Sequence, residues 1–258
     1  MKPFAMALTV GAILSMSIAR PLSAQEAESP ASTDEWSFTV APYVWFASLD
    51  GDITAIPGLP AANVDASFGD IFKHLDPSLM LAGEIRNDRF GFLADIIFIQ
   101  LSADGSVPFG LFSTADADIS NFIGTFEGAY RVVDTENIDL DLLGGVRVWT
   151  VDTEISLGAG LLPARVAESK ETWADPMVGV RARADVGSGF YLTAWGNVGG
   201  FGAAADLDWD IFGGVGYEWN SWLSSIVGYR HLVVDHDHEG FVYDVTQTGP
   251  VIGGVFRF

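Results

Sequence analysis

The sequence predicts an all-β protein: a closed antiparallel up-and-down transmembrane β-barrel of about ten strands, with eight as the alternative number. Three observations lead to this fold class. Polar and apolar residues alternate with period two through ten segments, and the connections between segments are alternately short and long. In addition, seven of the nine arginines after residue 24 share one face of the alternation. The segments are therefore predicted to be strands with one face toward lipid and the other toward an interior.

Residues 1–24 are predicted to be a secretory signal peptide. Lys2 supplies a positive start, an apolar run extends from Phe4 to Ile18, and Leu22-Ser23-Ala24 has the small final residue of a cleavage site. The run is shorter than the roughly 20 residues of a spanning helix. Residues 25–35, rich in Ala, Ser, Pro and acids, are expected to form a flexible leader before a barrel domain at 36–258. We expect Sec-dependent export through the periplasm.

Composition excludes several other classes of protein. The chain has 13 Lys and Arg against 34 Asp and Glu, so it offers no basic face for nucleic acid. The absence of cysteine excludes a disulfide scaffold and zinc-thiolate or iron–sulfur centres. Charged residues make up 18% and aromatics 12%, the opposite of a disordered composition. Beyond the signal peptide, no stretch of 18 apolar residues would form a membrane helix.

The ten segments and their connections follow the pattern of bacterial barrels, which have an even number of strands. The predicted strands lie near 36–47, 77–86, 90–102, 117–133, 138–155, 176–186, 190–201, 207–219, 223–235 and 241–258. Short connections lie near 87–89, 134–137, 187–189 and 220–222, and longer ones near 48–76, 103–116, 156–175, 202–206 and 236–240. The short turns are expected on the periplasmic side and the longer, acidic loops outside.

The segment 138–152 shows the alternation most clearly. Ile138, Leu142 and Val148 share one face, and Asp141 and Arg147 share the other. A soluble sandwich would place its charges outside and a dry aliphatic core inside, whereas here the uniformly apolar face must meet lipid. The predicted lumen charge network consists of Glu84, Arg86, Asp95, Glu127, Arg131, Asp141, Arg147, Arg181, Arg183, Asp185, Asp210, Glu218, Arg230 and Arg257.

Aromatic residues support the membrane interpretation and narrow the predicted lumen. An interfacial girdle beside the short turns is predicted from Phe90, Tyr130, Phe190, Tyr217, Trp219 and Trp222. A barrel of ten strands is only slightly wider than the eight-stranded size, which side chains fill. With Trp45, Trp149, Trp195 and Tyr191 also on the inner face, the lumen is expected to be largely plugged.

Several short motifs resemble those of Gram-negative outer-membrane proteins. The chain ends in an alternating strand from Gly249 to a terminal Phe258, with Phe256 two residues before it, which resembles the C-terminal assembly signal of outer-membrane β-barrels. Tyr130-Arg131, Gly228-Tyr229-Arg230 and Ala41-Pro42-Tyr43-Val44-Trp45 are similar to segments of small OmpA/OmpW-like barrels, most of which have no assigned function. The resemblance implies an outer-membrane location, insertion by the barrel-assembly machinery, and contact with outer-membrane lipid and lipopolysaccharide. It implies no activity.

We therefore expect a structural or surface role without catalysis. The first alternative is a narrow cation-preferring channel or small-solute porin. The second is an omptin-like rim protease, in which Asp116 and Asp118 on one rim and Asp235 to His238 on another would activate water, although the omptin motifs are not matched. Lipid A deacylation is disfavoured because His231 has no nearby serine motif.

Metal binding is a weaker hypothesis, and no dedicated cofactor is expected. Imidazole and carboxylate groups gather in one predicted loop and are the ligand types of divalent cations: Asp235, His236, Asp237, His238 and Glu239. Asp50 with Asp52, and Asp206 with Asp208 and Asp210, would bind such ions loosely. An acidic external rim would share the divalent cations that bridge lipopolysaccharide phosphates.

Overall fold

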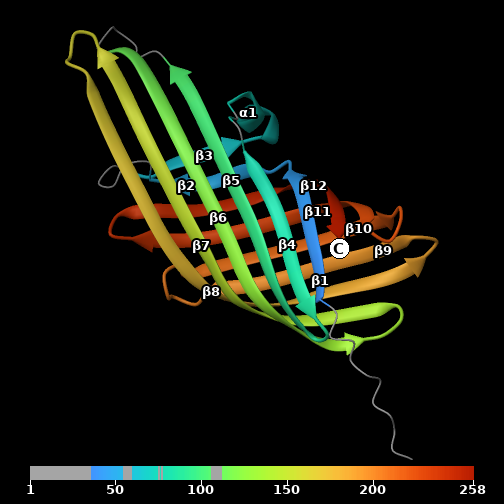
Figure 1. Ribbon diagram of the computed structural model, residues 1–258. Coiled ribbons are helices and arrows are strands. Elements are labelled where there is room, and N and C mark those ends of the chain that lie inside the picture. The colour runs from blue at the N-terminus through green and yellow to red at the C-terminus, as the bar shows by residue number, and fades with distance from the viewer. Residues whose placement is uncertain (1–35, 55–59, 75, 77, 106–111) are drawn as a thin grey trace, which may run out of the picture. The chain divides into compact units, whose positions relative to one another are not determined.

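The structure is a computed structural model that describes residues 36–54, 60–74, 76, 78–105 and 112–258 (Figure 1). The predicted signal peptide and leader, 1–24 and 25–35, lie outside these residues. Across them the chain forms twelve strands and one short helix. The elements are β1 (Trp36–Trp45), β2 (Ser48–Ile53), β3 (Ala62–Ala66), α1 (Phe68–Lys73), β4 (Leu79–Asn87), β5 (Phe90–Gly105), β6 (Phe112–Asp134), β7 (Ile138–Ala159), β8 (Arg165–Gly187), β9 (Phe190–Gly200), β10 (Leu207–Glu218), β11 (Leu223–His238) and β12 (Phe241–Arg257).

Ten of the strands close into an antiparallel barrel, which confirms the predicted fold class and number of strands. Strands β4 to β12 pair in chain order, and β1 pairs with both β4 and β12. Strand β2 continues β1 along β12 in the same register, since Trp45 lies opposite Val251 and Ser48 opposite Thr248. Strand β3 adds to β2 as a hairpin. The two extra strands lie in the segment 48–76, which was predicted to be a loop.

The connections at one end are tight turns that the sequence encodes locally. Gly187, Ser188 and Gly189 all have positive φ, a conformation that glycine adopts without strain. At the opposite end Glu239 and Gly240 also have positive φ and join β11 to β12 in a two-residue hairpin. The predicted external loop 236–240 is therefore mostly strand, because β11 extends to His238.

Two further loop predictions are wrong because the strands continue well beyond the apolar belt. Strand β7 ends at Ala159 and strand β8 begins at Arg165, both within the predicted loop 156–175. Strands β5 and β6 likewise take most of 103–116. The physical reason is that outward side chains there are polar, such as Thr150 and Asp152, so the lipid-facing pattern ends while backbone pairing continues.

The outward face carries an apolar belt of the height expected for a membrane. On β7 the outward residues are apolar from Ile138 to Val148, and Thr150 is the first polar one. Ten residues of a strand rise about 33 Å, which at a typical tilt of about 40° corresponds to a band of about 25 Å. On β8 Val178 and Val180 are about half exposed at mid-height. The belt therefore matches the hydrocarbon region that outer-membrane barrels span.

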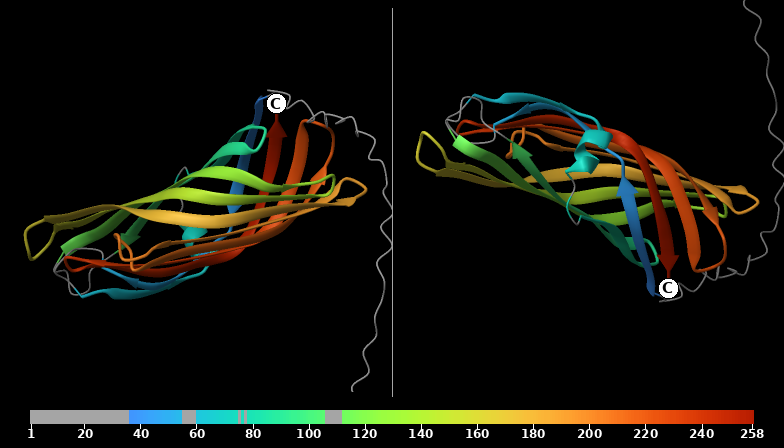
Figure 2. Two further views of the ribbon diagram at one scale, coloured as in Figure 1. Left: turned by 90° about the horizontal axis from the view of Figure 1, so that it is seen from below. Right: turned by 90° about the horizontal axis from the view of Figure 1, so that it is seen from above.

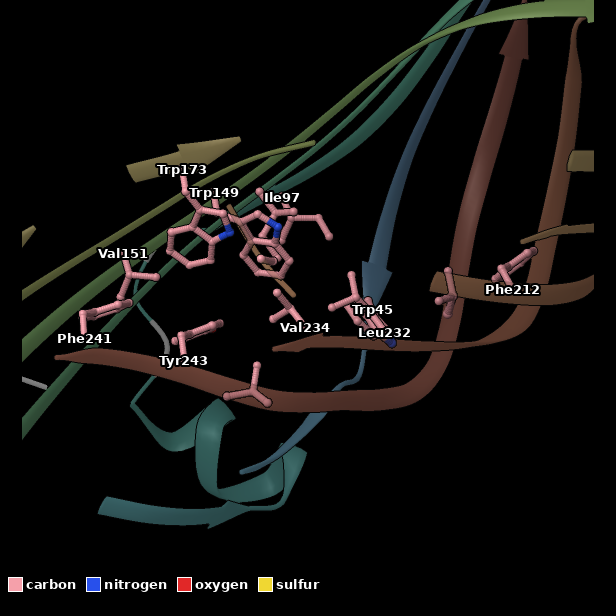
Figure 3. Packing of buried hydrophobic residues seen from close by; sticks show 14 residues of the cluster. Trp45, Ile97, Trp149, Val151, Trp173, Phe212, Leu232, Val234, Phe241 and Tyr243 are labelled. Atoms are coloured by element: carbon pink, nitrogen blue, oxygen red, sulfur yellow. The ribbon is translucent and has the colours of Figure 1, made fainter. Parts of the chain in front are cut away.

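The interior has two layers of different chemistry. The half near the short turns holds the arginines and carboxylates, whereas the half above it holds a buried cluster of Trp45, Ile97, Ile123, Trp149, Val151, Trp173, Phe212, Leu232, Val234, Phe241, Tyr243, Val245 and others (Figure 3). The sequence predicts an interior of charged residues with a few aromatic side chains among them, without a separate apolar layer. Its upper half is instead packed like the core of a soluble sheet sandwich.

Candidate functional site: the barrel interior

The lower charged cluster is centred on Asp141, which binds three arginines. Arg131 and Arg181 are its cross-strand neighbours on β6 and β8, so pairing register alone brings them to it. Arg131 Nε lies 2.8 Å and Arg181 Nη2 lies 2.7 Å from the carboxylate, and Arg86 Nη2 lies 2.9 Å away. Glu84 binds both Arg86 and Arg181, at 2.7 and 2.8 Å. Inward-facing side chains of β4, β6, β7 and β8 are thus connected by ion pairs across the lumen.

The central charged cluster lies one level higher and consists of Arg147, Arg230, Asp208 and Asp210, which are at most 2% exposed, together with the partly exposed Asp95. Arg147, which is 0% exposed, donates to Thr125 Oγ1 at 2.8 Å, to Asp210 at 3.0 Å and to Asp208. Arg230 donates to Asp210 at 2.6 Å and to Asp95 at 2.9 Å. These contacts connect β7, β10, β11 and β5. Charge-assisted bonds of this kind hold long side chains in one arrangement across the lumen.

The mouth of the barrel holds four further members of the predicted network, which are more exposed: Arg183, Asp185, Glu218 and Arg257. Glu218 accepts from Arg183 and Arg257, each at 2.8 Å, and Arg183 also binds Asp185 at 2.7 Å. The Arg183 guanidinium lies 3.7 Å from the centre of the Tyr191 ring. Within the described residues, Glu127 is the one predicted member that forms no ion pair, and only Asn197 donates to it, at 3.3 Å.

Three interior partners were absent from the predicted network. Asp208 accepts from Arg147 and from the Trp149 indole, the latter at 2.9 Å; Asp139 binds Arg131 at 3.0 Å; and Tyr43 donates to Asp95 at 2.6 Å. Asp139 and Asp208 have the same strand parity as Asp141 and Asp210, so the alternation of the sequence was sufficient to predict that both point inward. Asp208 was instead grouped with the acidic loops.

A cavity of about 560 Å³ occupies the lower half of the interior. Seven arginines and seven carboxylates line it. Small residues such as Ser37, Ala41 and Ala82 on β1 and β4 leave the space opposite these charges. The cavity ends at the buried side chains of Asp210 and Phe212, whereas its lining is exposed near Glu218 at the turns. It is therefore a vestibule that opens at the end of the barrel with the short turns.

Above the vestibule, aromatic rings pack against one another inside the barrel. Trp149 stacks on Trp173 with ring centres 5.6 Å apart, and Trp173 stacks on His236 at 4.2 Å. Tyr243 packs against both tryptophans (Figure 3). We call the rings of Trp149, Trp173, His236, Phe241 and Tyr243 the aromatic layer. The aliphatic side chains of Leu232 and Val234 complete it and are fully buried.

The β9–β10 turn also enters this space. Strands β9 and β10 end lower than their neighbours, and the turn between them brings Ala205 into the interior, where it is fully buried. Its backbone N–H donates to Asp175 Oδ1 at 2.8 Å. His236 Nδ1 lies 3.0 Å from the carbonyl oxygen of Ala204. Two side chains therefore fasten the turn inside the barrel.

The predicted metal-ligand residues are divided between the two faces of β11. His236 points inward onto Trp173, whereas Asp235 and Asp237 have the opposite parity. His238 and Glu239 are exposed at the hairpin. Among the residues that the structure describes, no group of three or more His, Cys, Asp or Glu side chains is placed to hold a metal ion.

Asp235 lies instead in a row of carboxylates on the outer surface. It faces Asp244 on β12, which in turn faces Asp52 on β2. Partial burial, and after it the neighbouring carboxylates of Asp244, Asp206 and Asp237, raise the pKa of Asp235 above its ordinary value. This acidic row begins directly above Val233, the last apolar outward residue of β11.

The residues of the protease hypothesis do not come together. Asp116 and Asp118 have outward parity on β6, and Asp118 accepts from Ser102 Oγ at 2.7 Å. His236 lies inside the barrel on β11. His231, considered for lipid A chemistry, lies on the outward face beside Trp209, with ring centres 4.9 Å apart. The wall of the barrel separates these aspartates from the buried imidazole.

The predicted girdle residues form aromatic pairs on the outer surface. Phe90 packs on Tyr130 at 5.1 Å, and Tyr217 packs on both Phe190 and Trp219 at 4.8 Å. Trp222 stacks on Phe256 at 6.2 Å. The terminal Phe258 exchanges backbone hydrogen bonds with Phe38 at 2.8 and 3.1 Å, which closes the barrel between β12 and β1.

Comparison with known proteins identifies the fold. No protein-family model matches the chain, and no curated protein sequence matches it. Among solved structures, the outer membrane protease OmpT from Escherichia coli is similar with a TM-score of 0.54 and 10% identity over 90% of this chain and 99% of that one. Ail of Yersinia pestis, solved with the heparin analogue sucrose octasulfate, matches with a TM-score of 0.40 and 12% identity over 86% and 98% of the two chains. Neisserial surface protein A matches with a TM-score of 0.35 and 13% identity over 86% and 96%.

These identities show the fold alone. The chain has the closed ten-stranded antiparallel architecture of outer-membrane β-barrels.

Proposed function

We propose that the chain is an integral protein of the Gram-negative outer membrane with a closed lumen, a structural or surface role and no catalytic activity. The observation that carries this proposal is the pair of consecutive barriers inside the barrel. In the central charged cluster, Arg147, Asp210 and Arg230 are at most 2% exposed. Directly above, Trp149, Leu232 and Val234 are fully buried. Because water reaches neither level at these side chains, a continuous aqueous path past them is not expected.

The exterior supports the membrane location. No helix in the described part of the chain has the length and apolar character needed to cross a membrane. The strands carry a belt of about 25 Å instead, bounded by aromatic pairs at the turn end and by acidic residues above. A protein of this kind would contact outer-membrane lipid and lipopolysaccharide and would be inserted by the barrel-assembly machinery. Divalent cations would bridge its acidic row to lipopolysaccharide phosphates.

The arrangement of polar groups supports a non-catalytic role. Water activation by a rim protease requires carboxylates and an imidazole around one accessible point. Here Asp116 and Asp118 face outward, and His236 is buried in the aromatic layer. The central charged cluster is fully bonded internally, which suits a structural role better than proton transfer to a substrate.

Single-channel recording in planar bilayers tests the closed lumen directly. The refolded mature protein is expected to show no resolved conductance steps. The double variant Trp149→Ala/Trp173→Ala, which thins the aromatic layer, removes the indole bond to Asp208. It is still expected to stay closed, because the ion pairs of Arg147 and Arg230 with Asp210 remain. Nanosiemens-scale non-selective steps in the wild type would replace the proposal with a general porin.

Two further outcomes decide the alternatives. A small cation-selective current that loses its selectivity when Asp235, Asp237 and Glu239 become Asn and Gln would identify a narrow cation channel. Raising the salt concentration should weaken that selectivity, since the Debye length falls from about 10 Å at 0.1 M to about 3 Å at 1 M. Peptide cleavage abolished by His238→Ala, or by His236→Ala in protein that still folds, would identify a protease.

A further inference from the structure

The barrel wall changes its pairing on the side where α1 lies. Strand β1 pairs with β4 as far as Pro42 and Leu81. Beyond that level β2 pairs on this side with β3, and in the described residues neither β2 nor β3 pairs with β4 or β5. Helix α1 follows β3, and the His74 carbonyl after it accepts from Ser102 N on β5 at 3.0 Å. The helix therefore links the two sides of a seam in the wall.

Helix α1 lies outside the barrel and is held there by aromatic contacts. In Figure 3 it appears on the side of the sheet away from the labelled core residues, and Figure 2 shows it against the outer surface. Phe68 packs edge-on against Phe46, with ring centres 4.8 Å apart, and Phe72 lies 5.6 Å from Phe68. Ser67 caps the helix by accepting from Asp70 N at 3.3 Å, and Lys73 binds Asp70 at 3.0 Å.

The level of this aromatic group coincides with the upper edge of the apolar belt. Phe46 N donates to the Pro250 carbonyl at 2.8 Å, which places Phe46 beside an outward apolar residue of β12. The next outward positions along β2 are Ser48 and Asp50. Phe46 is thus the last apolar outward residue on its strand, and α1 extends the apolar surface at that level.

The exposed side chains of α1 are one large aromatic ring and a pair of opposite charges, Asp70 and Lys73. Phe72 is 63% exposed, and Lys73 beside it is also exposed. A short helix with aromatic residues on one side and an exposed Lys73–Asp70 ion pair on the other suits the boundary between acyl chains and headgroups. Aromatic rings are favoured at this depth, and unpaired backbone at a seam is tolerated only where it is covered or reaches polar surroundings.

We infer that α1 is an interfacial anchor of the outer leaflet. Phe68 and Phe72 occupy the acyl–headgroup boundary, Lys73 lies among lipid phosphates, and the helix covers the seam between β3 and β5. The occupant of this surface is lipid, because the aromatic group is continuous with the lipid-facing belt through Phe46 and Val44. The inference rests on the proposed membrane location and adds a specific lipid contact to it.

Site-directed spin labelling tests the anchor, and the absence of native cysteine makes single labels unambiguous. The variants are Phe72→Cys, Val178→Cys as the reference in the apolar belt, and Lys170→Cys as the reference on the polar surface above it. Each is refolded into vesicles of phosphatidylcholine and phosphatidylglycerol, checked for heat-modifiable gel mobility, and measured for collision with oxygen, which concentrates in lipid, and with a water-soluble nickel complex. The label at 72 is expected to show an oxygen-to-nickel ratio several-fold above that at 170 and approaching that at 178.

The references separate failure of the inference from failure of the proposed function. A ratio at 72 equal to that at 170, with 178 still in lipid, would overturn the anchor and leave the membrane barrel in place. A water-exposed label at 178 would overturn the membrane location, and the anchor with it. A second label at Phe68→Cys should be as oxygen-accessible as that at 72, whereas a strong nickel signal there would also contradict the anchor.

Discussion

Replacing Arg147 by methionine should destabilise the barrel more than any change at the mouth. The side chain is 0% exposed and donates to Thr125, Asp208 and Asp210. Without it, Asp208 keeps only the Trp149 indole and Asp210 keeps Arg230. Breaking a buried ion pair costs about 3–5 kcal/mol. Since each carboxylate retains one donor, we expect a loss near 3 kcal/mol, which at a urea dependence of about 1–3 kcal/mol per M lowers the midpoint by about 1–3 M.

Tryptophan fluorescence during urea unfolding in lipid vesicles measures this loss, and Arg183→Met is the matched control. Arg183 binds Asp185 and Glu218 at the exposed mouth, where ion pairs contribute about 0–1 kcal/mol. Adding Asp208→Asn to Arg147→Met should restore part of the stability, because it removes the unpaired charge. Equal losses for Arg147→Met and Arg183→Met, or a further loss in the double variant, would refute the buried cluster as described.

Three further predictions concern assembly, lipid and pH. Deleting Phe258, whose backbone closes the barrel against Phe38, should reduce heat-modifiable folding and outer-membrane yield; unchanged values for both would contradict this role. Val180→Arg places a charge at mid-height in lipid and should cost about 2–4 kcal/mol in urea unfolding, so a harmless substitution would invert the assignment of faces. The pKa of Asp235 is raised in the folded state, so the protonated carboxyl group stabilises the fold at acidic pH. This stabilisation is lost as the pH rises through the folded-state pKa. Asp235→Asn should therefore raise the free energy of unfolding by about 0.2–1 kcal/mol at pH 7 and leave it unchanged near pH 3. A variant that is less stable at pH 7 would be inconsistent with repulsion between Asp235 and Asp244.

The barrel and much of its ionic interior were accessible from sequence because strand parity is strict. A shift of one residue would move every side chain of a strand to the other face, so register is fixed wherever one face must meet lipid. Once Val180 is assigned to lipid, Arg181 must point inward, and pairing of β7 with β8 then places it opposite Asp141. Parity gives no distance across the lumen. The central charged cluster, which joins β7 to β10 and β11, therefore required the closed structure.

Strand ends, β3 and α1 were not predictable by the same criterion. The search for strands followed an apolar outward face, and that face ends at the membrane surface rather than at the end of the strand. Helix α1 has six residues and no helical periodicity that a pattern would reveal. Its position depends on the contact between Phe68 and Phe46, which are 22 positions apart in the chain.

The interior aromatic layer does have a sequence signal, which is an exchange of the apolar face along single strands. On β7 the residues Val146 and Val148 face outward, but above them Trp149 and Val151 face inward while Thr150 and Asp152 face outward. Strand β11 changes in the same way. Its inward residue Arg230 is charged, but the inward residues above it, Leu232 and Val234, are apolar, and the outward Asp235 is charged.

This exchange has a single physical cause: each strand leaves lipid and enters water partway along its length. Below the exchange the exterior must be apolar, so the polar groups are inside and must bind one another. Above it the exterior is wet, and only the interior remains to bury apolar surface, which gives the packing of a soluble sandwich. The two interpretations of period-two alternation, membrane barrel and soluble sandwich, therefore hold for successive halves of the same strands. The proposed closed lumen would follow from this change, because the upper half folds by excluding water from its interior.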